Sequence, residues 1–96
     1  MGDPESDMGF VFKKIDVFAY FYKGNNYPTP VRFRYNDEDG GEETVVIDKV
    51  LSVKEDKSVP GIFRFMYNCQ SYKNGLLYLY QLCYDPKDSH WMLYKI

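Results

Sequence analysis

The chain has 96 residues, which is enough for one domain with a modest hydrophobic core and too few for two. Apolar residues make up 45% and charged residues 27%, which is typical of a globular protein, and no apolar run approaches the ~18 residues of a membrane-spanning helix. The net charge of −2 argues against broad nucleic-acid binding but leaves room for a local basic face.

Aromatic residues are the unusual part of the composition. Ten Tyr, seven Phe and one Trp make up 19% of the chain, and these residue types favour strands. There is no long run with apolar residues at helical spacing. We therefore predict an all-β fold, a six-stranded antiparallel meander that is strongly twisted and curled into a partly open small barrel.

Residues 1–9 are polar and acidic, the reverse of the basic start and apolar middle of a signal peptide. We expect a flexible leader over residues 1–9 and a single β domain over residues 10–96. Because the chain has only two cysteines and no export signal, the expected location is the reducing cytoplasm.

The first predicted hairpin joins a strand over 13–22 to a strand that begins near Pro30. Apolar residues alternate along both segments, which is strand behaviour, and residues 23–25 supply the turn. A three-residue loop there predicts that Ile15 faces Phe33, Asp16 faces Arg32, and Val17 faces Val31. This register brings apolar residues and opposite charges together.

The third predicted strand, Thr44 to Glu55, is long, and its alternation is blurred around Asp48. A bulge or sharp bend there would explain the pattern, and bent strands let a small sheet curl. The next two strands form the clearest hairpin, because Asn74-Gly75 is the preferred pair for a two-residue type I′ turn. This turn pairs Phe65 with Tyr84, and the last strand starts at His90.

Both cysteines lie in this hairpin, with Cys69 on its aromatic face and Cys83 on the opposite face. A disulfide needs converging side chains, so the predicted register disfavours one. A zinc site would have to recruit His90 over long spacings, and a catalytic thiol would have to be exposed and activated. We predict that both thiols are free and serve packing, and that Cys69 is the slower to react.

Other chemical sites find little support in the sequence. Asp37 and Asp39 precede two glycines, but the spacing and terminal Glu of an EF-hand calcium loop are absent. There is also no glycine-rich phosphate loop and no serine nucleophile motif. We predict a protein that is not an enzyme and that holds no cofactor and no metal.

The second face of the predicted sheet is the most informative surface, because a one-sided sheet would be polar there. It carries three arginines with several aromatic and apolar residues, namely Arg32, Arg34, Arg64, Phe18, Tyr20, Tyr22, Met66, Tyr72, Leu77 and Leu79. Neighbouring loops and the leader could cover these side chains; a protein partner or a second copy could cover them; or bases could stack on them. Our prediction is a protein-interaction face with Tyr20, Tyr22, Arg32 and Arg34, and the alternative is a single-stranded nucleic-acid binder that uses the same face.

Three segments carry a family resemblance. "PVRFRY" leading into "TVVIDKVLSVKE", followed by "YQLCYDPKDSHWMLYKI", resembles small bacterial all-β domains of uncharacterised function, some of which accompany translesion DNA polymerases. The resemblance spans roughly residues 30–96, and "NDEDGGEE" stands where those domains have a Gly-Arg turn. It implies the all-β fold and a bacterial cytoplasmic setting, adds weight to the nucleic-acid alternative, and carries over no catalytic residue.

Overall fold

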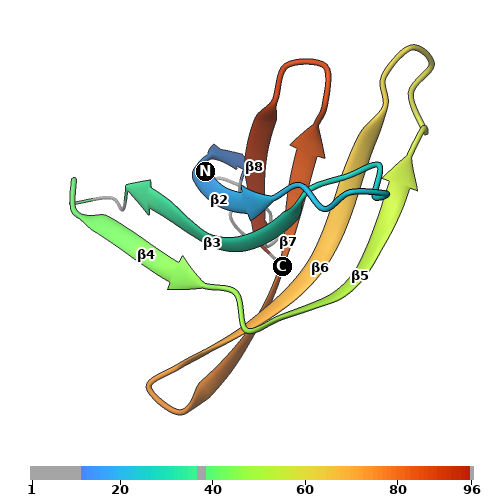
Figure 1. The fold of residues 1–96 in the computed structure, drawn as a ribbon. Helices are drawn as coiled ribbons and strands as arrows, with labels where there is room; N and C mark the ends of the chain where they lie inside the picture. Colours follow the sequence, from blue (N-terminus) through green and yellow to red (C-terminus); the bar gives the residue numbers. More distant parts are fainter. Residues whose placement is uncertain (1–11, 37–38, 96) are drawn as a thin grey trace.

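The computed structural model describes residues 12–36 and 39–95, which form eight β-strands and no helix (Figure 1). The strands are β1 (Phe12–Lys14), β2 (Asp16–Tyr20), β3 (Thr29–Asn36), β4 (Glu42–Val46), β5 (Lys49–Asp56), β6 (Arg64–Lys73), β7 (Leu76–Asp85) and β8 (His90–Lys95). Over these ranges there is accordingly no helix of the length and apolar character that crossing a membrane requires. The leader predicted over residues 1–9 lies outside the described residues.

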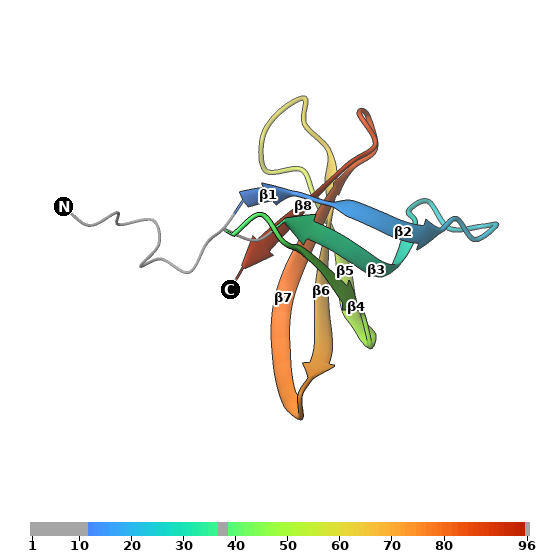
Figure 2. The ribbon, with the colours of Figure 1, turned by 90° about the vertical axis from the view of Figure 1, so that its left-hand side faces the viewer.

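The strands form two antiparallel sheets. One sheet has five strands in the order β1-β8-β7-β6-β5, and the other has three in the order β2-β3-β4. In Figures 1 and 2 the three-stranded sheet crosses one face of the five-stranded sheet. The all-β antiparallel prediction is confirmed, whereas the single six-stranded sheet is replaced by two sheets.

Two bends in the chain account for this difference. The first predicted strand divides at Ile15, whose N–H donates to the Trp91 carbonyl at 3.3 Å before the chain enters β2. The third divides after β4, where the Ile47 N–H donates to Val31 at 2.9 Å and the Asp48 N–H to Gln70 at 3.0 Å. At each bend one long strand therefore leaves one sheet and joins the other. The sequence predicts only the second bend.

The core lies between the two sheets and is built largely from aromatic rings. Phe65, Tyr67 and Leu82 of the five-stranded sheet are almost completely buried, and Phe33 of β3 is buried with them. The ring of Phe33 meets that of Tyr80 edge-on, with centroids 5.5 Å apart. The aromatic alternation of the sequence therefore builds the core.

Polar contacts also tie the sheets together. The Tyr67 hydroxyl donates to the Pro28 carbonyl, just before β3. The Ser71 hydroxyl lies 2.6 Å from the Val46 carbonyl at the end of β4 and 2.6 Å from the Tyr80 hydroxyl. These buried hydroxyls therefore have the partners that burial demands.

The β6–β7 hairpin has the predicted register, with Phe65 opposite Tyr84 and Cys69 opposite Tyr80. Asn74 and Gly75 have φ values of 53° and 79°, as a type I′ turn requires. Cys69 and Cys83 are both buried and unbridged.

The predicted register of the first hairpin is wrong by two residues. Val17 lies opposite Phe33, and Asp16 lies opposite Arg34. The connection runs from Tyr20 to Thr29 and is longer than predicted, and the ladder is irregular between Phe18 and Ala19. We attribute the longer connection to Pro28 and Pro30, which cannot donate to a ladder and so delay regular pairing. Over residues 16–18 the shift is even, so these side chains keep their predicted faces; beyond the irregularity, where Ala19 lies opposite Pro30, the shift is one residue.

Candidate functional site

The four predicted interaction residues lie together on the outer side of the three-stranded sheet. Tyr20 is on β2, Arg32 and Arg34 are on β3, and Tyr22 is in the loop that follows β2. All four are exposed. With Phe18, an exposed residue of β2, they form what we call the aromatic–arginine face, defined as Phe18, Tyr20, Tyr22, Arg32 and Arg34.

The side chains of this face contact one another. The Arg32 guanidinium lies over the Phe18 ring, 4.6 Å from its centroid, and the Tyr20 and Tyr22 rings are 5.9 Å apart. A cation over a ring is attracted by the negative face of the ring, which holds the Arg32 guanidinium against Phe18. The face therefore presents aromatic rings together with a guanidinium that contacts one of them.

Arg34 has a different environment from Arg32. Its guanidinium lies 3.8 Å from the Asp16 carboxylate and 4.0 Å from that of Glu42. The predicted Asp16–Arg32 pair is thus wrong, because the register shift places Asp16 opposite Arg34 instead. The charge of Arg34 is balanced by two carboxylates on its own sheet.

The remaining members of the predicted second face lie elsewhere. Arg64 is on β6 and forms a 2.8 Å ion pair with Asp56 of β5. Met66, Tyr72, Leu77 and Leu79 also belong to the five-stranded sheet. The predicted single face is therefore divided between two sheets. Only the part on the three-stranded sheet contains the four predicted interaction residues.

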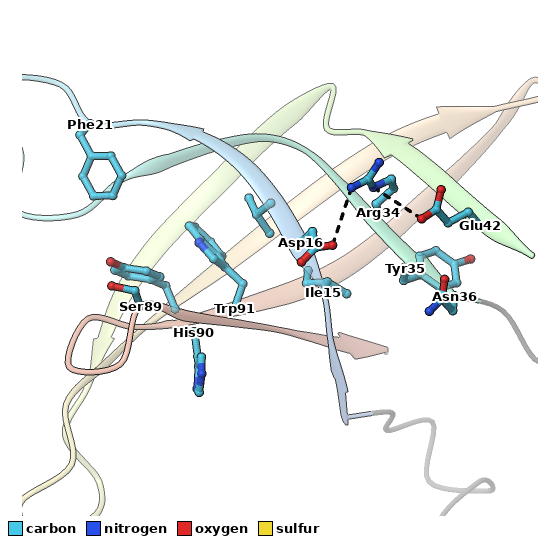
Figure 3. Close-up of a pocket in the computed structure, with 12 residues that line it drawn as sticks. Ile15, Asp16, Phe21, Arg34, Tyr35, Asn36, Glu42, Ser89, His90 and Trp91 are labelled. Atoms are coloured by element: carbon cyan, nitrogen blue, oxygen red, sulfur yellow. Dashed lines mark ion pairs between the residues drawn. The ribbon is translucent and has the colours of Figure 1, made fainter. Parts of the chain in front are cut away.

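An open cleft of about 680 Å³ runs along β2 beside this face (Figure 3). Phe21 stands at one end, and the charged group of Asp16, Arg34 and Glu42 stands at the other. Trp91 lies between them, with its ring 4.7 Å from that of Tyr84. The cleft combines an aromatic lining with a charged end.

The sequence does not predict this cleft. Strict alternation places Phe21 on the inner side with Val17, but β2 ends at Tyr20 and Phe21 is exposed. The prolines Pro28 and Pro30 are the one signal that could have indicated the cleft. They imply a long loop after β2, and the residues of such a loop no longer alternate between the two faces of a sheet. Trp91 alternates with its neighbours in the last strand and gives no sign of lining a cleft.

The thiols show no activation. Burial raises the pKa of Cys69 to about 12, and burial also raises the pKa of Cys83, an effect partly offset by the charge of Arg64 and a hydrogen bond with Tyr94. A catalytic thiol needs the opposite shift.

Across residues 12–36 and 39–95, no three His, Cys, Asp or Glu side chains are grouped so that they could hold a metal ion. Asp37, part of the calcium alternative, lies outside the described residues.

Comparison with known proteins finds no matching family model, no matching curated protein and no matching solved structure. The resemblance to small bacterial β domains stays a prediction.

Proposed function

We propose that this chain is a non-enzymatic protein-interaction module whose partner covers the aromatic–arginine face. The observation that carries the proposal is the exposure of the three aromatic residues of this face, which is 51% for Phe18, 60% for Tyr20 and 55% for Tyr22. Tyr, Phe and Arg are enriched at protein interfaces, and contiguous exposed apolar surface usually marks one.

The charge distribution favours a protein partner over a nucleic acid. A platform for single strands needs several cations that follow the phosphates while bases stack on the rings. On this face Arg34 is balanced by Asp16 and Glu42, so its charge is largely compensated. Arg32 is engaged with Phe18. Single-stranded nucleic acid remains the runner-up, because stacked rings and an arginine also suit bases.

The partly open barrel is also a proposal. The outer strands of the two sheets are joined in pairs along the chain. β1 of the five-stranded sheet continues into β2 of the three-stranded sheet, and β4 of the three-stranded sheet continues into β5 of the five-stranded sheet. A ring of strands joined through these two bends would be a small barrel, and the cleft beside β2 would be its opening. The partner would then lie next to the opening, where β2 has no neighbour on one side among the described strands.

The cellular setting follows as a further part of the proposal. Two unbridged cysteines with raised pKa suit a reducing cytoplasm, where thiols persist without forming disulfides. The same raised pKa values support a role without a nucleophilic thiol. We therefore assign the module no reaction, no cofactor and no metal.

Partner capture with matched variants tests the proposal. Wild-type protein, a Tyr20→Ser/Arg32→Ser double variant and a Val59→Ser control would be cross-linked in a cell extract and the captured proteins quantified. Val59 is exposed in the loop between β5 and β6, away from the face. We expect a partner that wild type and the control capture and the double variant loses. Equal capture by all three proteins would contradict the proposal.

An oligonucleotide titration tests the runner-up. Labelled protein is titrated with oligo-dT and with oligo-U at two salt concentrations while its amide shifts are followed. Phosphate contacts release counterions, so nucleic-acid affinity would fall by roughly 0.7 log units per log unit of salt for each phosphate contacted. Salt-sensitive shifts at Tyr20, Tyr22 and Arg32 would reverse the ranking.

A further inference from the structure

The open cleft beside β2 is not needed for the proposed contact with a protein partner. Its volume of about 680 Å³ lies within the range of ~300–1,000 Å³ that is typical of small-molecule sites. It lies where the chain passes from β1 into β2 and so from one sheet to the other (Figure 3). The described residues around the cleft indicate what kind of molecule it fits.

One wall of the cleft is an aromatic ring that is held in place by its neighbours. The ring of Trp91, a half-buried residue, lies 4.7 Å from that of Tyr84 and 5.3 Å from that of Tyr67, measured between centroids. A ring packed on two others is already ordered, so binding against it costs little conformational entropy. Phe21 adds a second ring at the end of the cleft, and Val17 adds aliphatic surface. These walls fit the apolar body of a ligand.

The charges at the other end of the cleft do not balance. The carboxylates of Asp16 and Glu42 stand there with the single guanidinium of Arg34. His90 lines the cleft as well, but Figure 3 shows its ring directed away from this group. Among the described lining residues, the charged end therefore carries one net negative charge.

Arg34 leaves both carboxylates accessible to a ligand. Its guanidinium lies 3.8 Å from the carboxylate of Asp16 and 4.0 Å from that of Glu42, whereas the Arg64–Asp56 pair of the other sheet closes to 2.8 Å. The side chains of Asp16 and Glu42 are 82% and 62% exposed. Exposed ion pairs are weak, and an ionised carboxylate can accept several hydrogen bonds. A ligand can therefore donate hydrogen bonds to both carboxylates.

An apolar body with a positively charged head group matches both ends of the cleft. The body would lie against Trp91 and Phe21, and a cation is also attracted by the faces of such rings. The head group would donate to Asp16 and Glu42, where an anionic group would be repelled. We propose that the cleft binds organic cations in which an ammonium or guanidinium group is carried on an aromatic or aliphatic body. The inference goes beyond the proposed function, because this site needs no protein partner.

Trp91 reports directly on the cleft, because it is the only tryptophan of the chain. Its fluorescence and the resonance of its indole N–H can both be followed while a probe is added. Three probes share a phenyl ring and a short chain and differ in their end group, namely 3-phenylpropylamine, which is a cation at neutral pH, the uncharged 3-phenylpropan-1-ol, and the anion 3-phenylpropionate.

The three probes should bind wild-type protein in the order of their charge. The amine should change the Trp91 signals in a saturable way, with a Kd on the order of 1 mM, as expected for so small a probe. The alcohol should bind more weakly, because it makes no ion pair. The propionate should bind at least about tenfold more weakly than the amine, because it meets the net negative charge.

Variants separate the charged end of the cleft from its apolar end. Asp16→Asn/Glu42→Gln preserves the shapes of both side chains but leaves Arg34 as the charge of this group, so the propionate should now bind more tightly than the amine. Phe21→Ala should weaken all three probes by a similar factor. Glu55→Gln is the control, because it removes an exposed carboxylate of β5 that does not line the cleft, and it should behave like wild type.

A capped phenylalanyl-lysine dipeptide distinguishes two sources of the same chemistry. It carries a phenyl ring and an ammonium group in peptide form. Binding that is tighter than that of the amine would assign the cleft to a lysine or arginine side chain of a protein. Weaker binding would assign it to free small molecules.

Three results would overturn the proposal. One is a Trp91 signal that the amine leaves unchanged at concentrations well above the expected Kd, and another is equal binding of amine and propionate to wild type. The third is an Asp16→Asn/Glu42→Gln variant, shown by thermal unfolding to be folded, that still binds the amine more tightly than the propionate. The Tyr20→Ser/Arg32→Ser variant should bind the amine normally, since neither residue lines the cleft, so failure of this site and failure of the proposed function are distinguishable.

Discussion

At the scale of single residues, neighbours decide what each side chain can do. Arg32 and Arg34 are both exposed arginines of one strand, yet one lies over a ring and the other between two carboxylates. The sequence predicts the shared face of the two but not their different partners, because the partners depend on a register that the sequence does not determine. The two cysteines likewise share a hairpin and differ in surroundings.

The thiol environments predict a difference in reactivity. Burial raises the pKa of Cys69 to about 12, whereas Arg64 and Tyr94 partly offset the rise at Cys83. Since the thiolate is the reactive form, a raised pKa lowers the reactive fraction at any given pH below it. We expect iodoacetamide to modify Cys83 first and Cys69 increasingly as the pH rises towards 12. Peptide mapping by mass spectrometry measures both rates, and faster modification of Cys69 would contradict the assignment.

At the scale of elements, local turn chemistry decides what the sequence can predict. The register of β6 and β7 is correct because Asn74-Gly75 permits one tight turn and fixes every pair that follows. The first hairpin has no such signal, and the prolines before β3 lengthen its loop, so its predicted register fails. The sequence also does not predict the exposed apolar residues at the tip of the β6–β7 hairpin as a separate surface, because alternation assigns faces but not how far a ribbon projects.

The type I′ turn predicts a cost for replacing its glycine. Gly75 has a φ of 79°, and an L side chain in that region is strained although there is space around it. Gly75→Ala should lower the free energy of unfolding by about 1–2 kcal/mol. Thr44→Ala, at an exposed β4 position, is the control and should change it by less than about 0.5 kcal/mol. Equal stability of Gly75→Ala and wild type in urea unfolding would contradict the turn assignment.

At the scale of the whole molecule, two bends convert the predicted six strands into eight. The blurred pattern around Asp48 indicates one bend, but the alternation through Ile15 is unbroken in the sequence. Whether an alternating strand stays in one sheet depends on long-range packing, which a local pattern does not contain. The fold class was therefore predictable, and the division into two sheets was not.

The contact between the sheets predicts the effect of removing one hydroxyl. Tyr67→Phe keeps the ring in the core but deletes the donor to the Pro28 carbonyl, which is buried. An unsatisfied buried acceptor should lower the free energy of unfolding by about 1–3 kcal/mol. The exposed Tyr72 supplies the control, because Tyr72→Phe removes a hydroxyl that solvent can replace. Unchanged stability of Tyr67→Phe would show that this contact does not hold the sheets together.

The central claim is that a protein partner binds the aromatic–arginine face, and calorimetry with the captured partner tests it most directly. Exposed Tyr and Arg residues at the centre of an interface commonly contribute more than 1 kcal/mol each. We therefore predict that the Tyr20→Ser/Arg32→Ser variant binds at least about tenfold more weakly than wild type, which corresponds to about 1.4 kcal/mol, while Val59→Ser binds normally. An affinity that the double variant leaves unchanged would contradict the claim.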